Sequence, residues 1–316
     1  MVSGATGFVG SAVIGRLLTV SNICVIAGSR SSEPVWPVGV TPLLLPDFGG
    51  ASQLIPLVGV DVVVHSAARV HVMRDQASDP LAEFRKVNVE GTLNLARQAA
   101  AAGVRRFIFI SSIKVNGEGT PVGVPYLADA QAAPADPYGI SKMEAEQGLR
   151  ALAAETGMEV VIIRPTLVYG PGVKANFLNM MRWLHKGVPL PFGAIHNRRS
   201  LVALDNLADL IVTCIDHPAA ANQTFLVSDG EDLSTTELLR RMAAALGKPA
   251  CLLPVPSRLL ETAAALLGKQ ALSQRLCGSL QVDIGKTREL LDWTPPVSVD
   301  EALRKTAKHF LEQQSK

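Results

Sequence analysis

A glycine-rich turn close to the first residue restricts the fold of this chain more than any other feature. The segment Gly4–Gly10, of sequence GATGFVG, follows the short apolar segment Met1–Ser3 and leads into Ser11–Leu18, where apolar residues recur with helical periodicity. In a strand–turn–helix arrangement of this kind, the backbone comes close to a pyrophosphate group, which binds the free N–H groups at the start of the helix. We therefore expect this turn to bind a dinucleotide cofactor. The residues predicted to contact it are Gly4, Gly7, Phe8, Val9 and Gly10.

Short apolar segments alternate with longer segments of helical periodicity over the first half of the chain. This alternation predicts βαβ units, and hence an α/β protein with a Rossmann-type, doubly wound parallel sheet and helices on both faces. The predicted strands are Ile23–Ala27, Pro42–Leu45, Asp61–His65, Phe107–Ser111 and Val160–Arg164. The predicted helices are Gly10–Val20, Asp79–Gly103 and Ser141–Gly157.

The pattern changes after Pro165, which indicates a second domain. A Gly- and Pro-rich stretch, Tyr169–Gly172, interrupts the alternation, and mostly helical segments follow it. The later predicted elements are a strand at Phe225–Val227 and helices near Ser234–Leu246, near Arg258–Leu267 and from Val299. We expect residues 1–165 to form the dinucleotide-binding domain together with parts of 196–228, and residues 166–316 to form mainly a smaller α/β substrate-binding domain.

Composition and charge exclude several classes of protein. The chain has 30 Lys and Arg against 28 Asp and Glu, a net charge of +2 over 316 residues, which argues against a nucleic-acid-binding protein that works through a basic face. Its 4 cysteines lie far apart, without the spacing of a zinc site, and we expect no metal. Since no apolar stretch is long enough to cross a membrane and no secretory signal is recognisable, we expect a cytoplasmic protein that binds neither nucleic acid nor membrane.

The end of the second predicted strand bears on the choice between the two nicotinamide cofactors. NAD-binding proteins of this type carry an acidic residue about twenty positions after the glycine turn, which binds the ribose 2′-hydroxyl, whereas a nearby Arg accommodates the 2′-phosphate of NADP. Here Ser29 and Arg30 occupy this place, and the first carboxylate is that of Glu33. A guanidinium beside a hydroxyl suits a phosphate, so Ser29 and Arg30 favour NADP(H). If Arg30 is only a solvated loop residue, NAD(H) is also possible as the cofactor.

A tyrosine, a lysine and two serines form the candidate catalytic set. Tyr138 and Lys142 have the i, i+4 spacing that places both on one face of a helix. An ammonium beside a phenol favours the phenolate, so we expect Lys142 to lower the pKa of Tyr138 toward neutrality and make it a proton donor and acceptor. Ser111 and Ser112 follow a buried strand, at the place where doubly wound sheets bind ligands. One of these two serines is expected to hydrogen-bond the reacting oxygen together with Tyr138.

With these motifs the chain resembles the extended short-chain dehydrogenases/reductases over essentially its whole length, and within them the NAD-dependent epimerase/dehydratase family. The segments that carry the resemblance are Gly4–Gly10, His65–Ala68, Asn88–Thr92, Ser112 with Tyr138 and Lys142, Arg164–Pro165 with Val168–Gly172, and Arg199–Val202 with Asp205–Ala208. The resemblance implies a UDP-linked sugar as substrate and a homodimer. The cofactor contacts that it implies are Asp47 and Phe48 near the adenine, and Ser66, Ala67, Ala68, Asn88, Tyr138, Lys142 and Pro165. The substrate contacts that it implies are Ser112, Tyr138, Asn176, Arg275 and, on the diphosphate, Arg199.

The residues after Ser112 bear on the reaction. In the 4,6-dehydratases of the family, an Asp-Glu pair follows the catalytic hydroxyl and removes water, whereas here Ile113 and Lys114 occupy these positions. We therefore do not expect dehydration. Three further segments resemble the bacterial reductases that convert UDP-4-keto-6-deoxy-N-acetylglucosamine to UDP-N-acetylquinovosamine for surface polysaccharides such as the O antigen of lipopolysaccharide. These segments are Phe84–Thr92, Ser111–Glu118 and Phe225–Gly230.

The sequence thus predicts an NADP(H)-dependent 4-ketoreductase of a UDP-linked amino sugar. In this interpretation Tyr138 protonates the C4 oxygen, Lys142 lowers the pKa of Tyr138 and holds the nicotinamide ribose, and Ser112 orients the oxygen. Two alternatives stay open. One is a 4-epimerase of UDP-glucose or UDP-N-acetylglucosamine with tightly bound NAD, an isomerase with no net redox change. The other is a non-catalytic NADP-binding regulator, in which Tyr138→Phe would leave function intact.

Overall fold

A parallel sheet of 7 strands forms the centre of the computed structural model, which describes residues 1–31, 33–45, 47, 54–70, 79–266, 268 and 270–315. The strand order is β3-β2-β1-β4-β5-β6-β9, and each strand is parallel to its neighbours. The strands are β1 (Val2–Ser3), β2 (Val25–Ser29), β3 (Val40–Leu44), β4 (Val62–His65), β5 (Arg106–Ile110), β6 (Glu159–Pro165) and β9 (Thr224–Val227). The order runs outward from β1 in both directions, which is the doubly wound arrangement that the sequence predicts.

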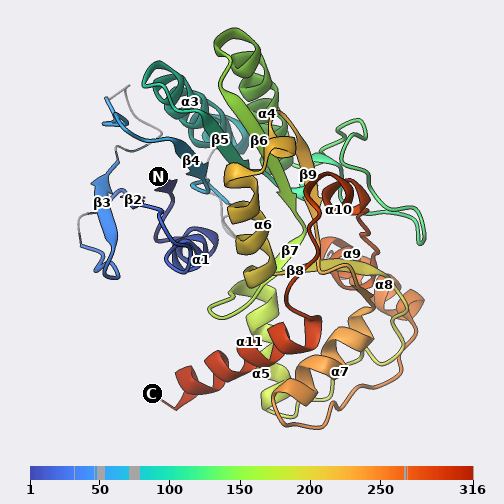
Figure 1. Cartoon of the computed structure of the whole chain (residues 1–316). Helices are drawn as coiled ribbons and strands as arrows, with labels where there is room; N and C mark the ends of the chain where they lie inside the picture. Colours follow the sequence, from blue (N-terminus) through green and yellow to red (C-terminus); the bar gives the residue numbers. More distant parts are fainter. Residues whose placement is uncertain are drawn as a thin grey trace.

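The central strands are apolar on both faces because helices cover both faces of the sheet (Figure 1). The helices are α1 (Phe8–Leu17) and α6 (Leu204–Asp216) on one face, and α3 (Thr92–Ala101) and α4 (Pro137–Thr156) on the other. Ile108 and Ile110 of β5 belong to the core under α1 and α6. Phe107 and Phe109 belong to the core under α3 and α4. This alternation follows from the period of two along a strand.

The predicted helix over 79–103 is divided into three shorter elements. Asp79 accepts a hydrogen bond from the backbone N of Ala82 and so caps α2 (Pro80–Arg85). A π-helical segment, η1 (Lys86–Gly91), follows, and α3 begins directly after it. Asn88 lies in η1 and is buried. π-helical turns are frequent at functional sites, and this one turns a polar side chain inward.

A smaller sheet and a core of its own are built from the later part of the chain (Figure 1). Its order is β10-β8-β7, with β7 parallel and β10 antiparallel to β8. The elements are β7 (Leu167–Tyr169), α5 (Ala175–His185), β8 (Arg199–Ala203), β10 (Asp232–Leu233), α7 (Thr235–Ala245), α8 (Ser257–Leu266), α9 (Gln270–Cys277), α10 (Gly285–Leu291) and α11 (Val299–Gln314). The apolar faces of α5, α7 and α11 enclose this second core.

The chain returns to the large sheet after it has left it. β9 comes after β8 and α6 in the sequence, but it pairs with β6 in the large sheet, and α6 packs against α1. The division of the chain into a dinucleotide-binding and a substrate-binding domain stays a prediction.

The described residues contain neither a candidate membrane span nor a candidate metal cluster. No helix in this part of the chain combines the length and the apolar character needed to cross a bilayer. Within the same residues, His, Cys, Asp and Glu side chains do not gather in groups of three or more that could hold a metal ion.

Candidate functional site

The predicted site residues gather at the carboxyl edge of the large sheet. β1, β4 and β5 are parallel neighbours, so the segments that follow them meet at one edge. The glycine turn follows β1, the segment Ser66–Ala68 follows β4, and Ser111 and Ser112 follow β5. Ligands of doubly wound sheets bind at this edge.

Steric contacts explain why glycine occupies the turn after β1. Gly4 has a φ of +68°, and a Cβ there would lie 2.6 Å from the backbone N of Ala67. A Cβ on Gly10 would lie 2.2 Å from the carbonyl O of Gly4. The exposed Gly7 precedes α1, whose first N–H groups have no partners within the helix. The turn therefore holds an open helix N-terminus at the sheet edge, and this arrangement fits the pyrophosphate of a dinucleotide.

Ser66 and Asn88 hold neighbouring segments together. Ser66 Oγ donates to the carbonyl O of Ser3 at 2.7 Å. Asn88 Oδ1 accepts from the backbone N of Arg69 at 2.8 Å, and its Nδ2 donates to the carbonyl O of Arg69 and to Oγ of Ser141, each at 3.0 Å. These bonds tie α4 to the segment after β4. Both side chains use polar atoms in hydrogen bonds within the protein, and their contact with a cofactor stays a prediction.

The remaining cofactor positions are placed as follows. Phe8 and Val9 lie half-buried in the first turn of α1, Ala68 lies three residues after β4, and Pro165 is the buried last residue of β6. Phe48 lies outside the described residues. None of these placements tests their predicted contacts.

Ser29 and Arg30 lie at the end of β2, together with Asp47. Ser29 is buried, and its Oγ accepts from the backbone N of Ser31 at 3.2 Å. The guanidinium of Arg30 lies 3.8 Å from the carboxylate of Asp47, and both side chains are more than 70% exposed. At the carboxyl end of β2, the cation of Arg30 is therefore exposed to solvent. Its acidic neighbour, Asp47, comes from the segment after β3.

Ser112, Tyr138 and Lys142 meet around the end of β5. Asp136 caps α4 by accepting from the backbone N of Gly139 at 2.7 Å, which places Tyr138 in the first turn of that helix. The Tyr138 hydroxyl is hydrogen-bonded to Ser112. Lys142 Nζ donates to the carbonyl O of Ile110, the last residue of β5, at 2.8 Å. The three predicted catalytic residues are thus brought together, as their motifs predict.

The electrostatics of Tyr138 differ from the expectation. Burial and the negative charge of Asp136 raise the pKa of Tyr138 to about 12, and the hydrogen bond from Ser112 opposes them only in part. Burial lowers the pKa of Lys142 to about 7, and the charge of Glu146 opposes that shift. The prediction that the pKa of Tyr138 is lowered toward neutrality is therefore wrong for this structure, because burial and the charge of Asp136 together outweigh the hydrogen bond from Ser112.

Lys142→Met is expected to stabilise the folded protein most at low pH. The pKa of Lys142 is about 7 in the folded chain against 10.5 for a free side chain, so below pH 7 the folded chain carries a buried ammonium. The cost is on the order of 5 kcal/mol below the folded pKa, and it is lost as the pH rises toward the unfolded value. Urea unfolding at pH ~6, ~8 and ~9 should show a gain for the variant that shrinks as the pH rises. The same substitution at exposed Lys308 serves as the control, and a gain that does not change with pH would contradict this account.

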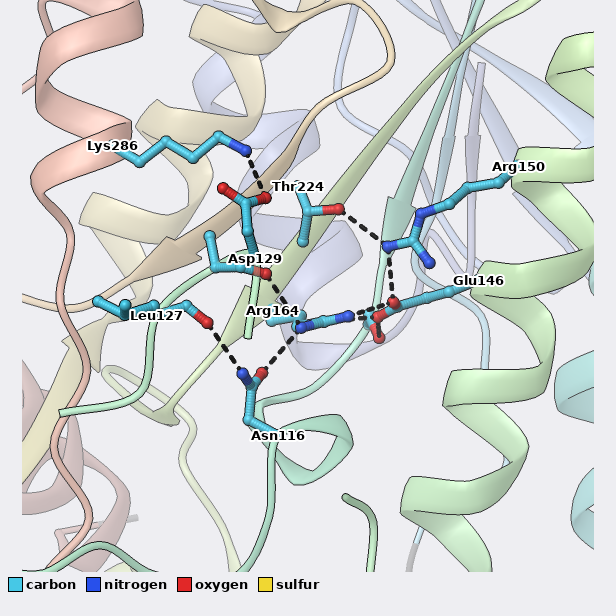
Figure 2. Close-up of polar contacts among 10 residues, drawn as sticks. Asn116, Leu127, Asp129, Glu146, Arg150, Arg164, Thr224 and Lys286 are labelled. Carbon is cyan, nitrogen blue, oxygen red and sulfur yellow. Dashed lines mark hydrogen bonds and ion pairs between the residues drawn. The ribbon is translucent and has the colours of Figure 1, made fainter. Parts of the chain in front are cut away.

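Glu146 of α4 and Arg164 of β6 form a buried ion pair (Figure 2). Arg164 Nε and one terminal nitrogen donate to the two carboxylate oxygens of Glu146 at 2.9 and 2.6 Å. Ser111 Oγ donates to the same carboxylate at 2.6 Å, and Arg150 reaches it at 3.1 Å. Since Glu146 lies one turn after Lys142 on α4, the pair joins the catalytic helix to the ends of β5 and β6.

The second terminal nitrogen of Arg164 holds the segment between β5 and α4. It donates to Oδ1 of Asn116 at 3.0 Å and to the carbonyl O of Ala128 at 3.4 Å (Figure 2). Asn116 Nδ2 in turn donates to the carbonyl O of Leu127 at 3.1 Å. The loop that follows Ser112 is therefore fixed to the same buried pair.

The sequence prediction missed the role of this pair. The spacing from Lys142 to Glu146 places both on one helix face, and Arg164 directly precedes Pro165 in a segment that carries the family resemblance. Those signals were present, but the contact itself depends on how α4 packs against β6, which is a property of the tertiary structure.

The predicted substrate residues are only partly brought together. Arg199 begins β8, and one of its terminal nitrogens donates to the carbonyl O of Gly278 at 3.0 Å. Burial lowers the pKa of Arg199. Arg275 lies in the last turn of α9, shortly before Gly278, and is exposed. Asn176 is exposed at the start of α5, whose apolar side chains belong to the second core.

The chain is similar to known proteins over nearly all of its length. It is 52% identical to the UDP-glucose 4-epimerase of Vibrio cholerae, over 99% of this chain and 95% of that protein. It is 29% identical to the UDP-glucose 4-epimerase of Mycolicibacterium smegmatis, over 98% and 97% of the two chains. The crystal structure of the UDP-glucose 4-epimerase of Thermotoga maritima with UDP-glucose matches with a TM-score of 0.77, covering 99% of this chain and 98% of that one, at 23% identity.

The family model described as "NAD dependent epimerase/dehydratase family" matches residues 1–228. This span contains the glycine turn, the three residues around the end of β5, and both members of the buried ion pair. The solved structure supports the fold, while the family model and the Vibrio cholerae relative support the family. The chain belongs to the NAD-dependent epimerase/dehydratase family.

Proposed function

We propose that the protein is a UDP-sugar 4-epimerase that uses tightly bound NAD, with UDP-glucose or UDP-N-acetylglucosamine as substrate. One observation carries the proposal: Ser112, Tyr138 and Lys142 gather beside the glycine turn in a chain 52% identical to a relative named UDP-glucose 4-epimerase. The comparisons support this alternative better than the ketoreductase that the sequence motifs favour. A homodimer stays a prediction.

The chemistry assigned to the protein side chains is proton transfer at the C4 oxygen of the sugar. When bound, NAD supplies reversible hydride transfer at C4. In its phenolate form Tyr138 removes the proton of the C4 hydroxyl and later returns it, so that no proton is consumed over the cycle. Ser112, which is hydrogen-bonded to Tyr138, orients the C4 oxygen and stabilises the negative charge that develops on it. The glycine turn, the end of β2 and Lys142 would hold the cofactor.

The nucleotide part of the substrate is assigned to Arg199 of the smaller sheet and to Arg275 of α9. Arg199 is half-buried and would gain a charge partner from a diphosphate, which a guanidinium fork binds well. Arg275 lies three residues before Gly278, whose carbonyl O accepts the hydrogen bond from Arg199. Binding energy from this remote group would position the sugar against Tyr138.

A 4-ketoreductase of a UDP-linked amino sugar is the second candidate, and the exposed Arg30 favours it. A reductase consumes a dissociable reduced cofactor, and the cation at the end of β2 suits the 2′-phosphate of NADPH. In this case Tyr138 would donate a proton to the C4 oxygen in one direction only.

A paired assay on the purified protein separates the two candidates. One arm incubates UDP-glucose or UDP-N-acetylglucosamine without added cofactor and follows the C4 epimer by NMR. The other arm supplies UDP-4-keto-6-deoxy-N-acetylglucosamine with NADPH or NADH and follows absorbance of the reduced nicotinamide. We expect epimer in the first arm and NAD released on denaturation of the protein. Cofactor consumption in the second arm without epimer in the first would refute the epimerase and establish the reductase.

Arg30→Ala is expected to weaken NADPH binding by about tenfold and leave NADH binding nearly unchanged, because a charged hydrogen bond to the 2′-phosphate is lost. Asp47→Asn removes the carboxylate that faces Arg30 at 3.8 Å and should strengthen NADPH binding. Quenching of tryptophan fluorescence measures both dissociation constants. An equal loss for NADPH and NADH in Arg30→Ala would remove Arg30 from cofactor discrimination.

A further inference from the structure

Lys114 lies between the catalytic serine and the start of the catalytic helix. Its backbone N donates to Oγ of Ser112 at 3.3 Å. Its Nζ forms an ion pair with Asp136 and another with Glu118, the second at 2.8 Å. The side chains of Lys114 and Asp136 are 29% and 20% exposed, so this pair is partly shielded from water. Lys114 therefore contacts Ser112 through its backbone and Asp136, the N-cap of the helix that carries Tyr138, through its side chain.

Asp136 is the N-cap residue of α4 and lies two residues before Tyr138. It caps the helix through the backbone N of Gly139, and its charge acts on the Tyr138 phenol. The fit is close, because a Cβ on Gly139 would lie 2.8 Å from the carbonyl O of Lys114. The segment of Lys114 is therefore packed directly on the first turn of α4.

We propose that Lys114 is a positioning residue that neutralises Asp136 beside Tyr138 and holds the Ser112 segment against the first turn of α4. The proposal rests on the proposed function, since that function assigns proton transfer to Tyr138. Burial lowers the pKa of Lys114, but its hydrogen bonds to Asp136 and Glu118 outweigh burial and raise it, so the side chain stays charged.

The elements packed around Tyr138 contribute one aromatic ring and several charged groups, which come from α4, α2 and the segment after β4. Lys142 lies one turn along α4. From α2, the ring of Phe84 meets that of Tyr138 at 5.9 Å between centroids. The guanidinium of Arg69 lies 5.8 Å from the Phe84 ring and 3.8 Å from the carboxylate of Glu83. Beyond them, Arg85 pairs with Glu144 at 2.6 Å, and His65 lies buried at the end of β4.

The proposal predicts shifts of opposite sign for its two members. Lys114→Met removes the cation and leaves the carboxylate uncompensated, so the pKa of Tyr138 should rise by about one unit. Asp136→Asn removes the charge but keeps the helix cap, since Asn caps as well as Asp, and the pKa should fall by about one unit. The double variant should lie between the two single variants, because the cation and the carboxylate act on the phenol with opposite signs and both are then lost. Lys114→Arg keeps the charge and should keep the wild-type value.

Titration of the phenol measures this without any assay of turnover. The chain has only 3 tyrosines, so subtracting the ultraviolet titration of a Tyr138→Phe version from that of each variant isolates Tyr138. Glu118→Gln, which removes the other partner of Lys114, is the matched control and should leave the titration unchanged. The pH dependence of turnover should shift in the same directions as the titration.

The outcomes separate the proposal from the function on which it rests. Opposite shifts in Lys114→Met and Asp136→Asn, with Lys114→Arg at the wild-type value, support the proposal. If Lys114→Met lowers only the unfolding midpoint and leaves the Tyr138 titration unmoved, the proposal is wrong and the lysine is merely structural. If the wild-type protein turns over no sugar nucleotide in either arm of the paired assay, the proposed function fails, and the titration still decides the role of Lys114.

Discussion

Tyr138→Phe is expected to lower turnover by about 10²–10⁴-fold, the usual contribution of general acid–base catalysis. The substitution removes the only atom of the side chain that can carry the proton, while the ring and its packing against Phe84 are kept. Folding and cofactor binding should therefore change little. Turnover with the preferred sugar nucleotide, measured at saturating substrate, tests this, and circular dichroism checks the fold.

Tyr126→Phe is the matched control for this loss. Tyr126 also carries a hydroxyl with a hydrogen bond, to the carbonyl O of Gly119 at 2.7 Å, but it lies on the loop between β5 and α4 rather than on the catalytic helix. Its variant should keep most of the activity. Should Tyr138→Phe retain full biological function, the non-catalytic regulator would replace both enzymatic interpretations.

Arg164→Ala is expected to lower the free energy of unfolding by about 3–5 kcal/mol, the cost of breaking a buried pair from one side. The variant leaves the carboxylate of Glu146, which is 1% exposed, with its strongest partner removed. It also frees Asn116 and the carbonyl O of Ala128 from their shared donor. Urea unfolding followed by tryptophan fluorescence measures the loss.

Arg150→Ala provides a control in the same network. Arg150 donates to Glu146 at 3.1 Å and to Thr224 at 3.0 Å, but its side chain is 48% exposed. A half-exposed ion pair contributes about 0–1 kcal/mol, so this variant should unfold close to the wild-type midpoint. Equal losses in the two variants would show that burial does not distinguish these ion pairs.

Local patterns were sufficient to predict most of the fold. The strands predicted at 61–65, 107–111 and 160–164 lie within one or two residues of β4, β5 and β6, because buried parallel strands are continuous apolar runs. The π-helical segment at Lys86–Gly91 was not predicted, since its pattern of apolar residues is that of an ordinary helix. The small sheet of β7, β8 and β10 was also missed, because β7 and β10 have only three and two residues and the strands pair between segments that are well separated in the sequence.

The motifs were sufficient to predict which residues form the candidate site, but not the electrostatics of the site. Tyr138, Lys142 and Ser112 could be found because helix spacing and strand ends determine where such side chains lie. The pKa of Tyr138 could not, because it depends on burial and on Asp136, and the sequence alone does not state how much water reaches a phenol. The motifs also did not decide between the epimerase and the ketoreductase. The similarity to a relative named UDP-glucose 4-epimerase supports the epimerase as the proposed function.

By itself, the sequence determined the doubly wound sheet, the glycine turn at its edge and the three residues that meet at the end of β5. These features depend on backbone geometry and on the periods of strands and helices, which are local properties. Tertiary structure alone decided that Glu146 pairs with Arg164, that His65 is held between Ser3 and Thr92, and that Lys114 pairs with Asp136 beside Tyr138. The physical reason is that hydrogen bonds and charge depend on which distant side chains the packed core places together, and on how much water it excludes from them.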